Sequence, residues 1–297
     1  MSQAIKPNLI MGTMRLGNWG ANMNKNQLQT FINQCIALEV KTFDLADIYG
    51  DYSSESEFGA ALDFSQNSSL RQQIQLISKC GIRRVCAARP AHRIKSYDLS
   101  QDHIIASAEQ SLKDLRTDYL DMLLLHRPDF LMQPDEVAAA FAKLQKAGKV
   151  RHFGVSNFSV SQFELLQTAA NLVTNQVEIS ILQRQAFEDG TLDCCLKNRI
   201  QPMAWSPFAG GQVFDNQSLN PSVQRIRSAA QAMLQKYEIT LDQLLLAWLL
   251  RHPAGILPVL GTAKIDRVQA AVRALSIVLT RTEWYDLWQA ATGETLP

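Results

Sequence analysis

Short apolar runs that suit β-strands alternate with amphipathic, helix-like stretches along the whole chain, and this alternation constrains the fold more than any other feature. Eight runs have the length and composition of strands. They cover residues 9–12, 42–45, 75–78, 119–125, 150–155, 174–179, 201–205 and 256–261. Repeated β/α units predict a parallel sheet, and eight of them favour its closure into a barrel. We therefore expect the α/β class and a (β/α)8 TIM barrel.

The intervening stretches carry the start and stop signals of helices. Ser54 with Glu57, and Thr240 with Gln243, suit capping boxes at two helix starts, and Gly148 suits the left-handed residue just past a helix end. The helix candidates cover residues 25–39, 54–64, 102–115, 134–147, 161–170, 222–237, 244–250 and 264–275.

No linker rich in Pro, Gly or Ser interrupts the alternation, so we expect residues 1–297 to form one domain. An open, doubly wound sheet is the competing architecture. To bind a dinucleotide, that fold places a G-x-G-x-x-G turn after its first strand. The corresponding turn here reads MGTMRLG over residues 11–17, so a dinucleotide would have to be held in another way.

The composition limits the classes of partner. Apolar residues make up 46% of the chain, and 29 basic against 28 acidic residues favour a small-molecule partner over nucleic acid or an anionic membrane. The five cysteines are irregularly spaced, as expected of reduced thiols, and show no zinc-ligand spacing. Residues 1–8 lack the pattern of a secretion signal, and the longest apolar run, 244–250, is too short for a membrane span. We therefore expect a cytoplasmic protein without a metal site.

Four residues that can carry proton chemistry lie at or just after the ends of three consecutive predicted strands. Asp44 lies at the end of the second strand and Tyr49 in the turn that follows it, whereas Lys79 and His126 lie at the ends of the third and fourth strands. In a closed barrel, the carboxyl ends of the strands form the face where active sites lie. We expect these four side chains to face one cavity.

These residue types complement one another chemically. A nearby ammonium stabilises the phenolate of a tyrosine, so Lys79 can make Tyr49 a better proton donor. The Asp44 carboxylate can hold the lysine protonated, and His126 can donate a hydrogen bond to a substrate oxygen. The set predicts a carbonyl reduction in which a hydride comes from elsewhere.

Each of the four residues has a more ordinary interpretation when taken alone. An Asp or Lys at a strand end often forms a salt bridge, a Tyr in a turn often packs, and a single His is often a core or surface group. Their joint appearance on three consecutive strand ends favours a shared chemical role.

The segments around these residues resemble the signatures of the aldo-keto reductase family, with a closer likeness to the bacterial YdhF-type oxidoreductases. The order and spacing of the segments match, and the resemblance spans nearly the whole chain. The segments are TFDLADIYG at 42–50, SKCG at 78–81, LHRPD at 125–129, GVSNF at 154–158, NQVE at 175–178, AWSPF at 204–208, and GT at 261–262 followed by Arg267. The resemblance implies a (β/α)8 barrel that binds NADPH, extended across its carboxyl-terminal mouth, without a Rossmann motif.

The resemblance also implies roles for individual residues. Tyr49 would be the general acid, Asp44 and Lys79 would tune it, and His126 would orient the carbonyl. The implied cofactor-binding residues are Gly12, Thr13, Met14, Ser156, Asn157, Gln176, Trp205, Ser206, Phe208, Gly210, Gly211, Gly261, Thr262, Lys264 and Arg267.

Two groups of these residues match positions with a defined partner on the cofactor. Ser156, Asn157 and Gln176 match the positions that bind the nicotinamide carboxamide, and residues 206–211 match the loop that covers the pyrophosphate with accessible backbone donors. The alternatives are ordinary. Ser156 and Asn157 also suit the cap of a helix that begins near residue 159, and the Gly210–Gly211 pair also suits a flexible turn.

A third group follows the last strand and bears on the choice between NADPH and NADH. Thr262, Lys264 and Arg267 match the residues that grip the 2′-phosphate, and a planar, permanently charged guanidinium suits a phosphate. We therefore expect NADPH. The alternative is a surface charge pair of Arg267 with Asp266 or Glu283.

Some positions depart from the family pattern. Many members stack a tyrosine on the nicotinamide, whereas this chain has Trp205, which narrows the pocket and makes the substrate harder to infer. Only about ten residues precede Gly12, so the N-terminal hairpin common in the family is expected to be missing or reduced.

Other residues have more than one interpretation. The basic loop at 81–95 either covers the site and favours anionic carbonyl compounds or is a solvated surface loop. Met14, Trp19 and Trp205 suit an apolar pocket wall. Cys80 suits either a redox-sensitive thiol beside a cation or an inert buried thiol. The tryptophans expected only to pack in the core are Trp248, Trp284 and Trp288.

Three functions remain open from the residues alone. The first is an NADPH-dependent reductase of aldehydes or ketones. The second is a regulatory or scaffold protein that binds NADPH and turns over slowly. The third is an aldolase that forms a Schiff base with Lys79, but this function leaves the motifs after the later strands unexplained. The sequence predicts neither the physiological substrate nor the oligomeric state.

Overall fold

The computed structural model describes residues 9–64 and 66–296, and it contains the closed parallel barrel that the alternation predicts. Going round the barrel, the strands follow the order β1, β10, β9, β8, β7, β6, β3 and β2, and each is parallel to its neighbours. They are β1 (Ile10–Gly12), β2 (Thr42–Asp44), β3 (Gln75–Cys80), β6 (Leu120–Leu125), β7 (Val150–Ser156), β8 (Leu172–Glu178), β9 (Met203–Trp205) and β10 (Leu257–Leu260). All eight predicted strands are therefore confirmed, and the fold is a TIM barrel.

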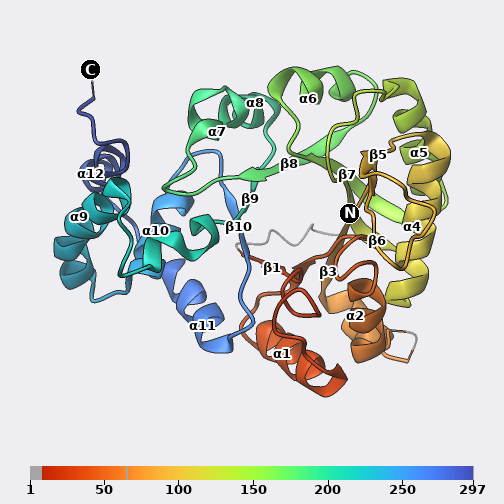
Figure 1. Ribbon diagram of the computed structural model, residues 1–297, viewed down its shortest axis with the longest axis horizontal. Coiled ribbons are helices and arrows are strands. Elements are labelled where there is room, and N and C mark those ends of the chain that lie inside the picture. The colour runs from red at the N-terminus through yellow and green to blue at the C-terminus, as the bar shows by residue number, and fades with distance from the viewer. Residues whose placement is uncertain (1–8, 65, 297) are drawn as a thin grey trace.

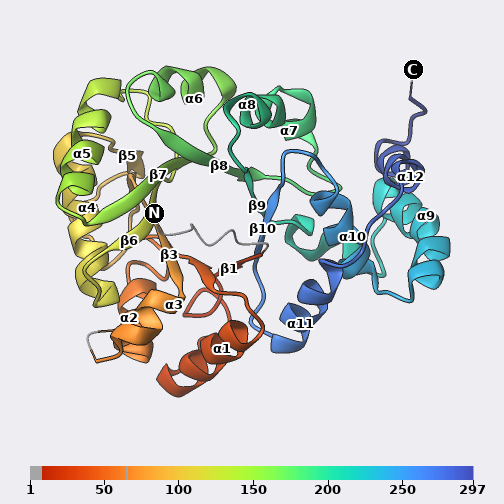
Figure 2. The same cartoon turned by 180° about the vertical axis from the view of Figure 1, so that it is seen from behind.

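Helices surround the barrel, as Figures 1 and 2 show from opposite sides. They are α1 (Lys25–Ala37), α2 (Ser54–Leu62), α3 (Ser68–Gln73), α4 (Gln101–Leu115), α5 (Pro134–Lys146), α6 (Val160–Gln167), α7 (Gln185–Glu188), α8 (Thr191–Asn198), the 3-10 helix η1 (Ala209–Phe214), α9 (Pro221–Tyr237), α10 (Leu241–Leu250), α11 (Ile265–Ala274) and α12 (Arg281–Thr292). The buried residues of α1, Leu28, Phe31, Ile32 and Cys35, have the helical spacing that places one face against the barrel. Every predicted helix is present.

The capping predictions had mixed outcomes. The Gln243 side chain accepts a hydrogen bond from the Thr240 backbone N–H at 2.9 Å, and Gly148 adopts a left-handed φ of +71°, as predicted. The box that pairs Ser54 with Glu57 is wrong. Ser53 is the residue before the helix, and its hydroxyl donates to the Glu57 carboxylate at 2.8 Å.

Several short elements were not predicted. β4 (Ile82–Arg83) and β5 (Ser96–Tyr97) follow β3 in the chain and form a small antiparallel pair, and strands of two residues are too short to show a period. The helix α8 begins after Gly190, which offers no side-chain cap and so gives no start signal. The prediction about an N-terminal hairpin falls on residues 1–8, which lie outside the described residues.

The last helices form a layer of their own beside the barrel. In Figure 1, α9 and α12 lie side by side outside α10. The rings of Trp248 and Trp284 stack with centroids 5.0 Å apart, and those of Trp284 and Trp288 with centroids 5.4 Å apart. Each indole of the first pair donates to a backbone carbonyl of the other residue. The predicted packing role of these tryptophans is confirmed.

The barrel interior explains how the strands deliver residues to one end. A buried apolar cluster inside the barrel contains Ile10, Ile77, Leu124, Met203, Leu257 and Val259. Side chains alternate along a strand, so the residue two positions further along faces the interior as well. Two positions beyond five of these residues lie Gly12, Lys79, His126, Trp205 and Gly261. The next layer of inward-facing residues, toward the carboxyl ends of the strands, therefore consists of predicted site residues.

The opposite, amino-terminal end of the strands holds a buried ion cluster. The Asp121 carboxylate accepts hydrogen bonds from Arg71 at 2.8 Å, from Arg151 at 2.9 Å and from the Leu76 backbone N–H at 2.9 Å. Both guanidiniums also lie 3.8 Å from the centroid of the Tyr119 ring. One carboxylate thus joins β3, β6 and β7 at the end of the barrel that holds no predicted site residue.

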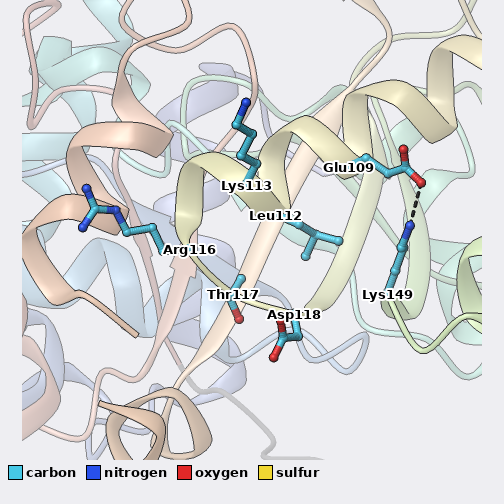
Figure 3. Close-up of a pocket in the computed structure, with 7 residues that line it drawn as sticks. All are labelled: Glu109, Leu112, Lys113, Arg116, Thr117, Asp118 and Lys149. Carbon is cyan, nitrogen blue, oxygen red and sulfur yellow. Dashed lines mark hydrogen bonds and ion pairs between the residues drawn. The ribbon is translucent and has the colours of Figure 1, made fainter. Parts of the chain in front are cut away.

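An exposed hollow nearby offers a contrast (Figure 3). It is lined by Glu109, Leu112, Lys113, Arg116, Thr117, Asp118 and Lys149. Its ion pair between Lys149 and Glu109, at 2.6 Å, lies in solvent, where such pairs contribute little. The hollow brings together no set of groups suited to chemistry.

The Asp121→Ala variant tests the buried cluster. It leaves the buried Arg71 without its carboxylate and the Leu76 N–H without an acceptor, so we expect the free energy of unfolding to fall by about 3–5 kcal/mol. Urea denaturation measures this. The matched control is Glu109→Ala in the exposed pair of Figure 3, which should move the urea midpoint far less. Equal shifts in the two variants would contradict the role of Asp121.

Candidate active site

A cavity of about 720 Å³ opens at the carboxyl ends of the strands. All the residues predicted for the site line it, with the exceptions of Lys79, Thr13 and Lys264. Lys79 lies directly beneath the cavity with no exposed surface. Thr13 is also buried, and both its backbone N–H and its hydroxyl donate to the Asp44 backbone carbonyl. Lys264 is exposed at the start of α11, so the structure brings neither Thr13 nor Lys264 to the cavity.

The ammonium of Lys79 connects the residues of the site through three hydrogen bonds. It donates to the Asp44 carboxylate at 2.7 Å, to the Leu45 backbone carbonyl at 2.8 Å and to the Tyr49 hydroxyl at 3.0 Å. Three acceptors match the three protons of an ammonium. The predicted association of Asp44, Tyr49 and Lys79 is present.

Burial and charge compete in setting the pKa values of this group. Burial alone would lower the pKa of Lys79, but the charges of Asp44 and Tyr49 and the hydrogen bonds to them outweigh it and raise the pKa. Burial also raises the pKa of Tyr49, and the Lys79 charge only partly offsets this effect. At neutral pH the lysine is therefore charged and the tyrosine keeps its proton.

His126 borders the same space. Its ring meets that of Tyr49 edge-on, with the centroids 5.9 Å apart. Burial and the positive charges of Lys79, Arg127 and Lys95 hold the pKa of His126 well below its usual range. The ring is therefore neutral at pH 7. Its Nδ1 is buried and finds no hydrogen-bond partner among the described residues.

Gln176 connects this group to the neighbouring strands. Its side-chain amide donates to the second oxygen of the Asp44 carboxylate at 3.0 Å, and its backbone carbonyl accepts from the Ser156 hydroxyl at 2.9 Å. The Asn157 side chain donates to Ser156 at 2.7 Å and accepts from the Trp205 indole at 3.0 Å. A continuous network thus runs from the Asp44 carboxylate to the indole ring of Trp205.

The alternative role of Ser156 and Asn157 as a helix cap is wrong. Ser159 caps α6, with its hydroxyl accepting from the Gln162 N–H and the Gln162 side chain accepting from the Ser159 N–H. Asn157 instead has a left-handed φ of +60°, which turns the chain at the end of β7. Both residues line the cavity.

A glycine pair and an arginine lie elsewhere along the cavity wall. Gly210 and Gly211 have φ values of +66° and +93°, and a methyl group added to either would project into open space. Arg267 makes no ion pair with any residue that the structure describes, and Glu283 binds Lys236 and Tyr237. The alternative of a surface pair with Glu283 or Asp266 is therefore wrong, and Arg267 is free to meet a ligand.

Some residues of the basic loop at 81–95 line the cavity and others do not, so each predicted interpretation holds for part of the loop. Arg84 and Lys95 line the cavity, whereas Arg83 pairs with Asp98 at 3.7 Å. Arg84 is itself paired with Asp51 at 2.6 Å. Cys80 is fully buried, which raises its pKa well above the usual range, so it is the inert thiol.

Some cavity residues were missed. Arg127 directly follows the predicted His126, and that position was the only signal for it. Ile48 and Ile82 complete the apolar wall that Met14, Trp19 and Trp205 were expected to form. Ile82 belongs to the unpredicted hairpin.

A buried carboxyl behind Lys79 was also missed. Glu55 accepts a hydrogen bond from the Ser78 hydroxyl at 2.5 Å, and burial raises its pKa to about 7.

Among the described residues, no three His, Cys, Asp or Glu side chains are arranged to hold a metal ion. No helix in the described part of the chain is long and apolar enough to cross a membrane.

Comparisons with known proteins agree with this geometry. A model described as the Aldo/keto reductase family matches residues 8–291. The oxidoreductase YdhF of Escherichia coli is 45% identical, over 97% of this chain and 94% of that protein, which confirms the predicted likeness. A 6-dehydroglucose reductase of Agrobacterium fabrum is 38% identical, over 96% and 94% of the two chains.

A solved structure extends the likeness to three dimensions. It is an aldo/keto reductase from Klebsiella pneumoniae in complex with NADP and acetate, 30% identical to this chain, with a TM-score of 0.76. The match covers 95% of this chain and 90% of that one.

The Lys79→Met variant tests the contacts of the Lys79 ammonium. It leaves the Asp44 carboxylate buried without its cation, so we expect the free energy of unfolding to fall by about 3–5 kcal/mol. Adding Asp44→Asn removes the stranded charge, so the double variant should be less destabilised than the sum of the two single variants. Urea denaturation of all four proteins completes the cycle. Additive effects would show that the two groups do not interact.

Proposed function

Because the chain belongs to the aldo/keto reductase family, we propose that it is an NADPH-dependent reductase of aldehydes or ketones in which Tyr49 donates the proton. The observation that carries this proposal is the Lys79 ammonium, which donates at once to Asp44 and to Tyr49 beneath the cavity.

The residues divide the work of proton transfer. Tyr49 keeps its proton at neutral pH, because burial raises its pKa, and so it can give that proton to a carbonyl oxygen. As the proton leaves, the phenolate forms 3.0 Å from the Lys79 ammonium, which stabilises it. Asp44 keeps the ammonium charged and in place. His126 is neutral and can donate one hydrogen bond that orients the same oxygen.

The remaining cavity residues fit an extended dinucleotide. Gly210 and Gly211 leave open space where a side chain would intrude, and Arg267 has no partner among the described residues. Ser156, Asn157 and Gln176 would hold the carboxamide, with Trp205 against the ring. NADPH, when bound, supplies the hydride to the carbonyl carbon. The NADP-bound relative from Klebsiella pneumoniae supports this assignment.

Two other functions receive less support. A Schiff-base aldolase needs a free amine, whereas the Lys79 ammonium is fully buried and donates to three acceptors. A scaffold protein that binds NADPH without fast turnover would need no proton donor. The complete Tyr49 group therefore favours a working reductase.

The Tyr49→Phe variant tests the proton donor. Removing the hydroxyl should lower kcat for aldehyde reduction by about 10²–10⁴-fold while the affinity for NADPH changes little. Burial raises the pKa of Tyr49 above its ordinary value of about 10, so the wild-type kcat should stay level from pH 7 to about 10 and fall above that. NADPH consumption with a panel of carbonyl compounds measures both effects. Full activity in the variant would refute the assignment, and no activity of the wild type with any carbonyl compound would favour the scaffold protein.

The Arg267→Met variant tests the cofactor preference. If the guanidinium binds the 2′-phosphate, its loss should raise KM for NADPH by about 10–100-fold, the effect of one charge-assisted hydrogen bond. KM for NADH, which lacks that phosphate, should change far less. Arg273→Met on the same helix is the control, because Arg273 is exposed and does not line the cavity. A wild-type preference for NADH would contradict the assignment.

A further inference from the structure

Two cations border the part of the cavity where the carbonyl would bind. The charges of Arg127 and Lys95 both act on His126, and that of Arg127 also acts on Tyr49. The Arg127 guanidinium lies 5.9 Å from the centroid of the Trp205 ring. Both residues line the cavity. They come from different loops, one after β6 and the other from the basic loop after β3.

Neither cation makes an ion pair or a hydrogen bond with any described residue, whereas two neighbouring arginines are paired with carboxylates. Arg84 is paired with Asp51 at 2.6 Å and lies 4.7 Å from the Trp19 ring. Arg83 is paired with Asp98 at 3.7 Å. Arg127 is half-buried and makes no ion pair or hydrogen bond with any described residue. A half-buried guanidinium without an acceptor is a binding group for an anion.

The carboxylate of Glu178 does not fill this role. Arg127 acts electrostatically on Glu178, but the two form no ion pair. Burial raises the pKa of Glu178, and the charge of Arg127 partly offsets this effect. The Asp44 carboxylate already accepts from Lys79 and Gln176. The positive charge beside Tyr49 and His126 therefore remains open to a ligand.

We propose that the carbonyl substrate carries a carboxylate, which binds Arg127 and Lys95 while the carbonyl oxygen meets Tyr49 and His126. The proposal rests on the reductase function given above. The planar fork of Arg127 suits both oxygens of a carboxylate, and the exposed Lys95 adds a second charge. The apolar side chains of Trp19, Ile48 and Ile82 line the same cavity and suit the carbon skeleton between the two groups.

A matched pair of substrates tests this binding site. 4-Carboxybenzaldehyde and its methyl ester carry the same aldehyde group on the same ring, but the ester replaces the carboxylate with a neutral group that is larger by one methyl. We expect the wild type to prefer the carboxylate in kcat/KM, and Arg127→Gln to lower that preference by about tenfold or more. Effects common to both substrates cancel in the ratio. Arg127→Lys should retain part of the preference, and Lys95→Gln should lower it less than Arg127→Gln.

An exposed arginine of the basic loop provides the control. Arg93 is exposed in the same loop and does not line the cavity, so Arg93→Gln should leave the preference unchanged. A wild type that prefers the ester, or an Arg127→Gln variant with an unaltered ratio, would overturn the proposal. An equal loss in Arg93→Gln would also overturn it, because the effect would then be general attraction rather than binding.

A binding measurement separates this proposal from the reductase function. Calorimetry with the enzyme and NADP⁺ compares 4-(hydroxymethyl)benzoate with its methyl ester, and it needs no turnover. Tighter binding of the acid that is lost in Arg127→Gln would support the anion site even if neither aldehyde were reduced. Equal binding of acid and ester would exclude the site even in an active reductase. Circular dichroism and urea midpoints establish that each variant is folded.

Discussion

A single buried ammonium sets the arrangement of the whole site. Lys79 has no exposed surface, and a buried cation is stable only when every proton finds an acceptor and its charge is balanced. Asp44 supplies the charge, the Leu45 carbonyl the second acceptor and Tyr49 the third. The need to satisfy Lys79 therefore determines where the tyrosine hydroxyl lies, and in the proposed function the same contact would stabilise the phenolate once the proton has left. Stability and chemistry depend here on the same three hydrogen bonds.

The strands of the barrel position this group because side chains alternate between the two faces of a strand. Ile77 belongs to the apolar interior, and Lys79 follows it by two positions, so it faces the same way one layer higher. Leu124 and His126 repeat the relation on β6. Because all the strands are parallel, the inward-facing residues at their carboxyl ends lie at the same end of the barrel. This explains why residues distant in sequence, such as Asp44 and Gln176, share a hydrogen bond.

Those same properties decide what could be predicted from the sequence. Strand runs, their parallel order and the residues at their ends follow from local patterns, and so the barrel and most cavity residues were predicted. The errors concern features set by tertiary contacts. Thr13 follows a strand as the other site residues do, yet its hydroxyl turns to the Asp44 carbonyl, and nothing local indicates this. The β4–β5 hairpin is too short to have a period, and its absence from the prediction hid the position of Ile82.

The pKa shifts indicate why the positive charges of Arg127 and Lys95 can lie near Tyr49 and His126 without changing the protonation of either group. Burial is the largest cause of the lowered pKa of His126, and the charges of Lys79, Arg127 and Lys95 come after it. An anion bound to Arg127 and Lys95 would cancel the effect of those two charges, but burial and Lys79 would still hold the ring neutral. Tyr49 responds in the same direction, since Arg127 lowers its pKa as well and an anion would remove that effect. Tyr49 would therefore keep its proton, and His126 would remain neutral. Both statements hold whether the charge of Arg127 is free or is neutralised by a bound anion.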